Sequence, residues 1–370
     1  MKIALDTRDL AFATTGTRTY LQELLMALRS RQGPDLELVE LSGLHGLGQQ
    51  PGSSFFGKLS QHLYLFIWKQ VALPLHCFFA RADVLICTDY LLPLLPCGAK
   101  KIVVFHDALF FDRPRQYPTL WLHYFRWVYL PAAHRAAAIV TPSFFSRDRL
   151  LHHFPKWSHQ LKVIYQGPKQ WPADLALSTH GVNVQQQLQG SPYFLHVGVF
   201  EQRKNLLLLL AAFANFSNRH SAKLLLIGRS NGKRYSDDAA NIERFIKEHR
   251  LQDRVVLAGY LPDDDLPYFY RQARAYVYPS VYEGFGIPLL EAFVHGLPVA
   301  AATGSALQEI AAEAALYFDP YQPPEVERCL EQLHTNEELR KELIEKGHER
   351  AKRFHWNELV EDFISLAASV

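Results

Sequence analysis

Short apolar segments alternate with longer segments of helical periodicity along most of this chain. The apolar segments fall into two series of predicted strands: 2–6, 36–41, 83–87, 102–105, 138–141 and 162–165, then 193–197, 223–227, 254–257, 275–278, 298–301 and 315–318. Helical spacing of apolar residues marks segments between them, such as 18–30, 118–135, 205–219, 240–250 and 288–296. Strands that are apolar at nearly every position are buried on both faces, so the pattern predicts an α/β protein with parallel sheets covered by helices.

A polar stretch separates the two series. Residues 168–191 contain two prolines and a run of three glutamines without clear periodicity, which indicates a linker. A chain of 370 residues with 48% hydrophobic content is long enough for two cores. We therefore predict two Rossmann-like domains, 1–170 and 171–353. The last segment, 337–370, is predicted to be helical and is rich in alternating charge up to about residue 353. Ligands of such sheets bind at the carboxyl ends of the strands, so a cleft between the domains is the expected active site.

Charge and cysteine content narrow the class of protein. The net charge of +2 conceals an asymmetry, because residues 1–170 carry 19 Lys+Arg against 11 Asp+Glu and the rest carries 20 against 26. A basic first half suits binding to an anionic membrane surface or to a phosphorylated acceptor. An uneven charge distribution without any function explains these counts equally well. The four scattered cysteines form no Cys-x-x-Cys pair, and the start Met-Lys-Ile-Ala-Leu-Asp reads as a strand, so we expect a cytoplasmic protein with reduced thiols.

The segment 282–293, Tyr-Glu-Gly-Phe-Gly-Ile-Pro-Leu-Leu-Glu-Ala-Phe, is the most informative part of the sequence. Glu283 lies in a glycine-rich loop, whose backbone can approach a ligand closely. Pro288 favours a helix start, which places Glu291 in the first turn near the positive end of the helix dipole. Two carboxylates and several backbone N–H groups around one spot suit a ligand with hydroxyls at both ends and an anion between them. A nucleotide sugar has this form.

Arg203 and Lys204 are candidates for holding the anion. They follow the strand 193–197 and precede a helix, where adjacent cations make a strong anion site. The planar fork of Arg203 and the point charge of Lys204 can hold a diphosphate and stabilise it as it leaves. Without the glutamate segment downstream, they could as well be two solvated loop cations.

Two positions in the first half are weaker candidates. His106 follows the strand 102–105, where it can contact a sugar hydroxyl or satisfy a buried turn. Gly16 and Thr17 lie in a strand-to-helix turn at 14–20, which can approach phosphate or sugar oxygens or act as an ordinary helix cap.

Aromatic and basic residues are mixed in segments 55–81 and 117–135, which contain Trp68, Lys69 and Arg126. Such helices either pack against the sheet or seat in a lipid headgroup layer. The first segment is too interrupted by polar residues and proline for a transmembrane helix.

Metal and nucleic-acid binding are not expected. The run Asp263-Asp264-Asp265 precedes a predicted helix and is interpreted as its cap and acidic first turn rather than as a metal site. The sequence contains no recognisable nucleic-acid-binding module.

These motifs resemble the retaining glycosyltransferases of family 4, which have the GT-B fold. The strongest similarity covers residues 276–310, which include the family signature of two glutamates separated by seven residues. Residues 198–205 resemble the family's diphosphate loop, although Val199 stands where many members have an arginine, so Arg203 is expected to carry more of the phosphate charge. Residues 227–228 and 258–261 resemble the strand ends of its base pocket. Residues that match the acceptor-side domain of the family more loosely are 16–17, 105–107 and 141–143.

The resemblance implies roles for the matching residues. The implied catalytic set is Glu283, His106, Arg203 and Lys204. Glu283 contacts the hydroxyls of the donor sugar, and His106 faces that sugar across the cleft. Glu291 contacts the nucleotide ribose. The other implied donor-binding residues are Gly16, Thr17, Gly228, Tyr260, Gly284, Phe285, Gly286, Ile287, Pro288 and Leu289. The helix at 354–370 is implied to return to the acceptor-binding first domain.

The predicted function is therefore a cytoplasmic, metal-independent retaining glycosyltransferase with no cofactor beyond its nucleotide-sugar donor. The loops at 14–20 and 201–205 look most like those of bacterial mannosyl- or rhamnosyltransferases of surface-polysaccharide assembly, which favours GDP-mannose as donor. The predicted acceptor is a glycan or lipid-linked glycan, and an anionic membrane surface is a further candidate partner. The alternatives are a GT-B nucleotide-sugar epimerase, which needs no acceptor, and a non-catalytic scaffold that binds nucleotide or membrane.

Overall fold

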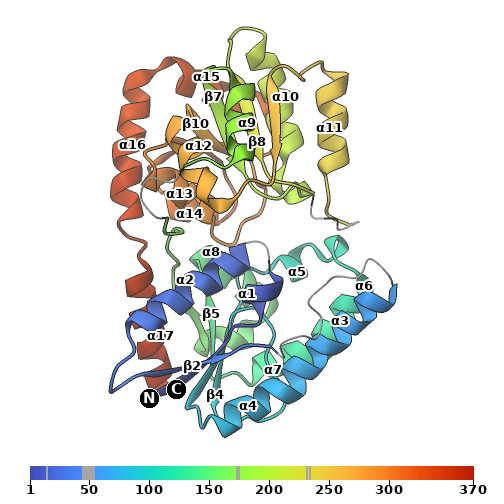
Figure 1. Ribbon diagram of the computed structural model, residues 1–370, viewed down its shortest axis with the longest axis vertical. Helices are drawn as coiled ribbons and strands as arrows, with labels where there is room; N and C mark the ends of the chain where they lie inside the picture. The colour runs from blue at the N-terminus through green and yellow to red at the C-terminus, as the bar shows by residue number, and fades with distance from the viewer. Residues whose placement is uncertain (14–15, 44–54, 172–175, 231, 233–234) are drawn as a thin grey trace. The chain divides into compact units, whose positions relative to one another are not determined.

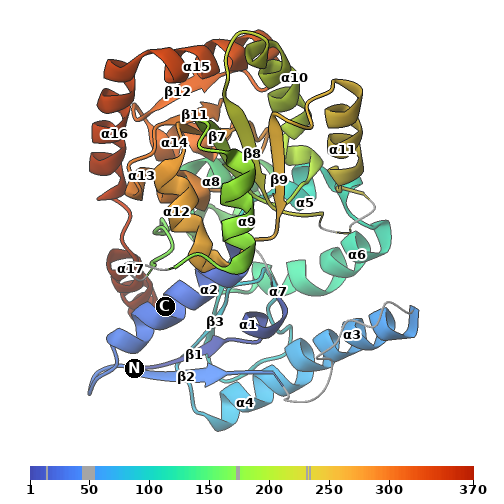
Figure 2. The same cartoon turned by 45° about the horizontal axis from the view of Figure 1, so that its top comes forward.

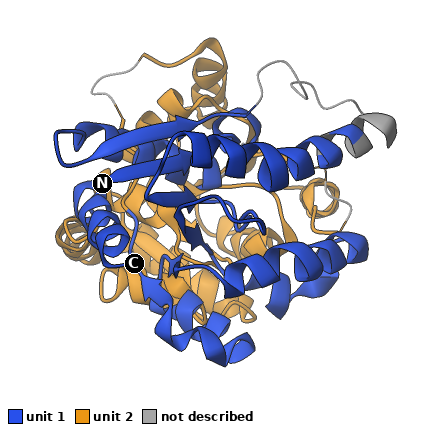
Figure 3. Cartoon of the chain, turned by 90° about the horizontal axis from the view of Figure 1, so that it is seen from below, with its two compact units in different colours: residues 1–166, 355–370 blue, residues 167–354 orange. Residues whose placement is uncertain are grey.

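The chain folds into two compact units. The computed structural model describes residues 1–13, 16–43, 55–171, 176–230, 232 and 235–370, without the side chains of 55–59 and 61. One unit comprises Met1–Gln166 and His355–Val370, and the other comprises Gly167–Phe354 (Figure 3). The divisions fall beside the predicted boundaries at 170/171 and 353/354. Thr14 and Thr15 of the predicted turn, and Pro172 of the predicted linker, lie outside the described residues.

Unit 1 is built on a parallel sheet of six strands in the order β2-β1-β3-β4-β5-β6 (Figure 1). Its strands are β1 (Lys2–Asp6), β2 (Glu37–Leu41), β3 (Val84–Cys87), β4 (Lys100–Val104), β5 (Ala138–Thr141) and β6 (Leu161–Val163). Its helices are α1 (Asp9–Phe12), α2 (Gly16–Ser30), α3 (Phe55–Ile67), π-helix η1 (Trp68–Ala72), α4 (Leu73–Phe79), α5 (Leu109–Asp112), η2 (Pro114–Gln116), α6 (Thr119–Tyr124), π-helix η3 (Phe125–Tyr129), α7 (Leu130–His134), α8 (Phe144–His153), η4 (Pro155–His159) and α17 (Trp356–Ser369).

Alternate residues of these strands enter different cores. Ile3 and Leu5 belong to a cluster with α2 and α17, whereas Ala4 belongs to a cluster with η1, α4, η3 and α8. This alternation is the two-residue period of a strand buried on both faces. The last helix, α17, lies beside α2 in Figures 1 and 2. The chain end therefore completes the core of the first unit.

Unit 2 has a second six-stranded parallel sheet, in the order β12-β11-β10-β7-β8-β9. Its strands are β7 (Tyr193–Val197), β8 (Lys223–Ile227), β9 (Val255–Gly259), β10 (Ala275–Tyr278), β11 (Val299–Ala302) and β12 (Ala315–Phe318). Its helices are α9 (Thr179–Leu188), η5 (Gln202–Lys204), α10 (Leu206–Ser217), α11 (Ala239–Glu248), η6 (Asp263–Asp265), α12 (Leu266–Gln272), α13 (Ile287–Val294), α14 (Ala306–Ala311), α15 (Pro323–Thr335) and α16 (Glu337–Ala351). All twelve predicted strands are present, with ends within two residues of those expected.

The prediction of a linker over 168–191 was wrong in part, because α9 occupies 179–188. Ser178 caps this helix by accepting a hydrogen bond from the Gly181 N–H, and Val184 and Leu188 are buried. The helix was missed because its polar face dominates the composition. Asp265, in the predicted acidic run, occupies the N-cap position of α12, but its carboxylate does not cap the helix, because it accepts hydrogen bonds from the Ser178 N–H and hydroxyl at 2.8 and 2.5 Å.

The side chains of Trp68 and Lys69 face the core of unit 1 and not a surface. Both side chains are buried, and the Lys69 ammonium lies 2.6 Å from Asp6 and 2.6 Å from Asp89. The Trp68 indole N–H donates to the same Asp6 carboxylate. Among the described helices, none is long and apolar enough to span a bilayer.

Candidate functional site

A buried ion cluster lies at the carboxyl edge of the second sheet. β7 and β10 are neighbours, and the loops that follow them bring Arg203 and Lys204 to Glu283. The Lys204 ammonium lies 2.7 Å and the Arg203 guanidinium 2.9 Å from the same oxygen of Glu283, Oε1. The Val281 N–H donates to the Arg203 carbonyl, which ties the two loops together. The structure therefore joins Glu283 to two adjacent cations, the nearer of which, Lys204, lies 79 positions before it in the chain.

Electrostatics keep the Glu283 carboxylate ionised. Burial by itself would raise the pKa of Glu283, but the charges of Arg203 and Lys204 outweigh it and lower this pKa to about 2. Burial also lowers the pKa of Lys204, an effect that Glu283 opposes. Glu201 accepts a second hydrogen bond from Arg203 at 2.8 Å and so fixes the guanidinium. Glu201 was not among the predicted site residues, although its place two residues before Arg203 was a usable signal.

The loop after Glu283 leads into the N-terminus of α13. Gly286 has φ = 109°, and a Cβ there would lie 2.6 Å from a methyl group of Leu307, so only glycine fits. Pro288 lies in the first helical turn, as predicted. The predicted series of N–H donors is shorter than expected, because Pro288 has no N–H and the Leu289 N–H already donates to the Gly286 carbonyl. Ile287 starts the helix, where N–H groups have no partner within the helix.

Glu291 differs from its predicted position. The helix begins at Ile287, so Glu291 is its fifth residue and lies in the second turn, where the helix dipole acts less strongly. Its carboxylate is buried and accepts a hydrogen bond from the Tyr270 hydroxyl at 2.8 Å. Tyr270 belongs to α12, so a helix outside the signature segment orients this glutamate.

The other predicted donor-side residues lie at neighbouring strand ends. Gly228 follows β8 with φ = 151°, and a Cβ there would lie 1.8 Å from the Gly198 carbonyl oxygen. The close approach of these two backbones explains the glycine. Tyr260 follows β9 and is 56% exposed.

His106 and the pair Gly16–Thr17 lie in unit 1. The His106 ring nitrogen Nε2 lies 2.7 Å from the Thr88 carbonyl, which makes Nε2 the protonated nitrogen. Burial lowers the pKa of His106 to about 4, although the Thr88 bond opposes this change, so the ring is neutral near pH 7. Gly16 and Thr17 are the first two residues of α2, and nothing lies within 4 Å of a Cβ placed on Gly16.

A second buried ion cluster, formed by Asp6, Lys69 and Asp89, was not predicted as a site. Asp6 ends β1 and Asp89 lies just beyond β3, so the cluster occupies the carboxyl edge of the first sheet. Burial raises the pKa of Asp89 to about 7, against the opposing charge of Lys69. The available signals were an aspartate that ends one predicted strand, a second aspartate two residues beyond another, and a lysine within an apolar segment.

In α/β units of this kind, ligands bind at the carboxyl ends of the strands, which here carry charged and glycine-rich loops. Residues 14–168 match the model of Glycosyltransferase Family 4, and residues 183–350 match that of Glycosyl transferases group 1. The chain is therefore a glycosyltransferase of the GT-B fold, with a family 4 domain followed by a group 1 domain.

Curated relatives agree with this family, and solved structures agree with the fold. The chain is 28% identical to O-antigen chain mannosyltransferase B of Escherichia coli, over 96% of both chains. It is 25% identical to O-antigen chain mannosyltransferase RfbU of Salmonella typhimurium, over 65% of this chain and 62% of that one. Among solved structures, sucrose-phosphate synthase from Thermosynechococcus elongatus has a TM-score of 0.76 at 19% identity, covering 100% of this chain and 98% of the other. WaaG, a glycosyltransferase involved in lipopolysaccharide biosynthesis, has a TM-score of 0.67 at 15% identity over the full length of both.

Proposed function

We propose that this glycosyltransferase retains the anomeric configuration and transfers mannose from GDP-mannose to a glycan or lipid-linked glycan, without a metal ion. The supporting observation is the cluster of Glu283, Arg203 and Lys204. An ionised carboxylate and two cations at one sheet edge match the hydroxyls and diphosphate of a nucleotide sugar. The mannosyltransferases among the relatives support the choice of sugar.

In the proposed reaction, the diphosphate leaves as negative charge develops on the oxygen that bridges it to the sugar. Arg203 and Lys204 stabilise this charge from fixed positions, which costs little reorganisation during the reaction. Glu283 holds both cations in place and accepts a hydrogen bond from a sugar hydroxyl through its second oxygen. In a front-face reaction, the leaving phosphate takes the proton of the acceptor hydroxyl. Glu291 binds the ribose, and His106, as a neutral ring, contributes to sugar binding.

The Glu283→Gln substitution tests this assignment, because it removes the charge and keeps the shape. We expect transfer from GDP-mannose to fall by about a hundredfold or more, on the scale of losing one fixed electrostatic group. Binding of GDP should persist, since Arg203 and Lys204 keep their charges. Glu243→Gln on the exposed face of α11 is the matched control. Equal transfer rates in wild type and Glu283→Gln would contradict the catalytic role.

Acceptor dependence separates the transferase from its alternatives. A GT-B epimerase would convert the donor in the absence of any acceptor, and a scaffold would bind nucleotide without turnover. Product analysis with and without a glycan acceptor therefore distinguishes the three functions. The anomeric configuration of the product, read from its NMR coupling constants, tests retention.

We also propose that unit 1 attaches peripherally to an anionic bilayer at the cytoplasmic face of a membrane. One face of α3, η1 and α4 exposes apolar side chains at helical spacing: Leu63, Phe66, Ile67, Val71, Leu75, Phe78 and Phe79. Exposed apolar area of this extent is unusual for a surface without a partner. Residues 55–82 contain no acidic residue, and Arg81 at the end of this stretch is exposed. Apolar and basic side chains together suit an anionic lipid surface.

Vesicle co-sedimentation tests this surface. Wild type should bind vesicles of phosphatidylglycerol and phosphatidylcholine more than vesicles of phosphatidylcholine alone, and less as salt increases. The double substitution Leu75→Ser and Phe79→Ser should weaken binding, whereas Val182→Ser, an exposed apolar position on α9, should not. Binding that ignores lipid charge, salt and the double substitution would contradict the proposal.

A further inference from the structure

Helix α14 holds the backbone of the Glu283 loop, residues 282–286. The Ala306 N–H, at the start of α14, donates to the Glu283 carbonyl at 3.2 Å. The next residue, Leu307, fills the space beside Gly286, where an added Cβ would lie 2.6 Å from one of its methyl groups. Because both contacts are made by the same short helix, a shift of α14 would move the carboxylate that forms the ion cluster.

A second contact holds the same loop from the end of unit 2. The ring of Phe285 is buried and meets the ring of Phe354 edge-on, with centres 5.7 Å apart. Phe354 is also buried, and it is the last residue of unit 2 before the chain returns to unit 1. The Phe285 ring therefore anchors the loop in the core rather than facing a ligand.

Arg350 of α16 joins these two contacts. Its Nε donates to the Ile310 carbonyl at 2.7 Å, and its Nη2 donates to the Glu309 carbonyl at 2.6 Å. Both carbonyls belong to the last turn of α14, where carbonyl groups have no partner within the helix. The guanidinium carbon also lies 5.1 Å from the centre of the Phe354 ring, within the range of a cation–π contact. One side chain therefore fixes both α14 and Phe354.

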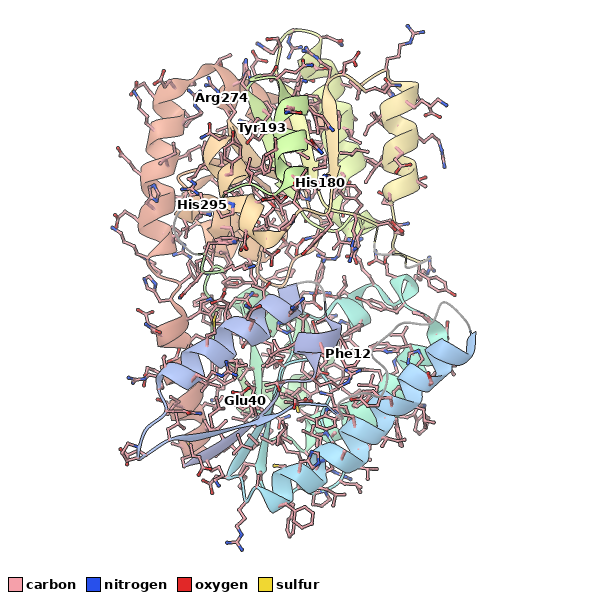
Figure 4. The ribbon with its side chains drawn as sticks, viewed as in Figure 1. Phe12, Glu40, His180, Tyr193, Arg274 and His295 are labelled. Atoms are coloured by element: carbon pink, nitrogen blue, oxygen red, sulfur yellow. The ribbon has the colours of Figure 1, made fainter. Side chains whose placement is uncertain are left out.

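The helix that carries Arg350 is itself fixed. It packs against α13, whose C-cap residue His295 is labelled in Figure 4. A Cβ on Gly347 of α16 would lie 2.7 Å from the ring of Phe293 on α13, so the two helices are in close contact. Because α13 also carries Glu291, α16 is fixed against one end of the signature segment while Arg350 supports the other.

We infer that Arg350 is a positioning residue that holds the Glu283 loop in the conformation that binds the donor sugar, an inference that rests on the proposed role of Glu283. A planar guanidinium can bond two neighbouring carbonyls and stack on a ring at the same time, which an ammonium cannot do. Displacing a binding group by about 1 Å is enough to slow a reaction roughly a hundredfold. Arg350 therefore acts on the sugar site only through other residues.

Arg350→Lys tests the inference on the full chain. We expect kcat for GDP-mannose hydrolysis, in which water replaces the acceptor, to fall about tenfold to a hundredfold. Calorimetric binding of GDP should stay within about twofold of the wild type, because a lost positioning contact at the sugar loop lowers turnover without removing nucleotide binding. Glu201 and Tyr270, which hold Arg203 and Glu291, are unchanged in this variant.

Two further variants separate positioning from general stability. Phe354→Leu removes the ring and keeps an apolar side chain, so it should also lower kcat, and its effect should not add fully to that of Arg350→Lys if both act on one loop. Arg274→Lys is the matched control. Arg274, labelled in Figure 4, also donates to a carbonyl in the last turn of a helix, that of His334 on α15, but it precedes β10 at the amino edge of the sheet. Its kcat should equal that of the wild type.

Hydrogen exchange of the ligand-free protein gives a readout that does not need turnover. Amides of residues 282–290 should exchange faster in Arg350→Lys than in the wild type, and Arg274→Lys should leave them unchanged. Unchanged kcat and exchange in Arg350→Lys would overturn the inference and leave the proposed function intact. Equal losses of GDP binding and kcat would also overturn it, because a general structural defect would then explain both. Failure of the folded wild type to bind GDP-mannose or GDP would overturn the inference and the proposed function together.

Discussion

Several charged side chains of this protein are buried and paired with one another. Lys204 with Glu283 in one unit, and Lys69 with Asp6 and Asp89 in the other, are held away from water at the carboxyl edge of a sheet. Desolvation of charge costs several kcal/mol per ion, which close pairing has to offset. Such clusters occur at sites that bind or react more often than in ordinary cores. The first cluster is part of the proposed donor site. The second places buried charge at the carboxyl edge of the sheet in unit 1.

His106 provides a pH-dependent prediction at this scale. Its pKa is about 4 in the folded protein and about 6.5 when unfolded, so the unfolded chain binds the proton first as pH falls. The stability linked to His106 is complete above pH 6.5 and is lost progressively toward pH 4, by roughly 3 kcal/mol. Urea unfolding should therefore show a smaller loss of stability between pH 7 and pH 4 in His106→Gln than in wild type.

The exposed His152 on α8 supplies the control for that experiment. His152→Gln should follow the pH dependence of the wild type. If His106→Gln and wild type lose equal stability over this range, the ring is protonated in the folded protein at mild pH. The assignment of His106 as a neutral hydrogen-bond donor would then be wrong.

At the scale of elements, the glycine-rich strand ends show why certain turns cannot vary. The loops after β7 and β8 approach so closely that the Gly198 carbonyl occupies the space of a side chain on Gly228. The same loops carry Lys204 and Arg229, so their close packing sets the spacing between the ion cluster and Arg229. A change in the turn should therefore alter both stability and nucleotide binding.

Gly228→Ala tests the effect of this contact. A Cβ at 1.8 Å from a backbone oxygen cannot be accommodated without moving a strand end, so we expect a loss of about 3 kcal/mol or more. Gly190→Ala is a matched control, because Gly190 also has a positive φ (68°) but no atom lies within 4 Å of its added Cβ. It should cost about 1 kcal/mol. Equal melting temperatures for the two variants would show that the β7 and β8 loops are not tightly packed.

At the scale of the whole molecule, the chain leaves its first unit and returns to it. Residues 1–166 are joined by 355–370, and α17 places Trp356, Val360 and Phe363 in the core beside α2. The Trp356 and Tyr20 rings meet edge-on with centres 5.5 Å apart. The last residues of the chain therefore affect the stability of the first unit.

Phe363→Ala should destabilise unit 1 by about 3–5 kcal/mol, because it empties the space of a fully buried phenylalanine. Hydrogen exchange measured by mass spectrometry should show faster exchange in β1 and β3, with β8 and β10 unchanged. Ser369→Ala at the exposed end of α17 is the control. Equal acceleration in both units would mean that they unfold as one cooperative body.

The sequence by itself determined the twelve strands, the division into two units and the segment that identifies the family. These follow from local signals: apolar strands, helix starts and a glycine-rich loop between two glutamates. The linker prediction over 168–191 failed at α9, because a polar helix with few buried residues has a weak periodic signal. Glu291 was placed in the first helical turn and lies in the second, because the helix begins at Ile287, one residue before the proline that marked its predicted start.

Only the tertiary structure decided which residues meet. Arg203 and Lys204 contact Glu283 because β7 and β10 are neighbours in the sheet although they are far apart in sequence. Lys69 was compatible with core packing and with a lipid interface, and the structure places it between Asp6 and Asp89. The pairing of Arg229 with Tyr260 depends in the same way on adjacent strands. Strand order places distant residues side by side, and a pattern along the chain does not contain that order.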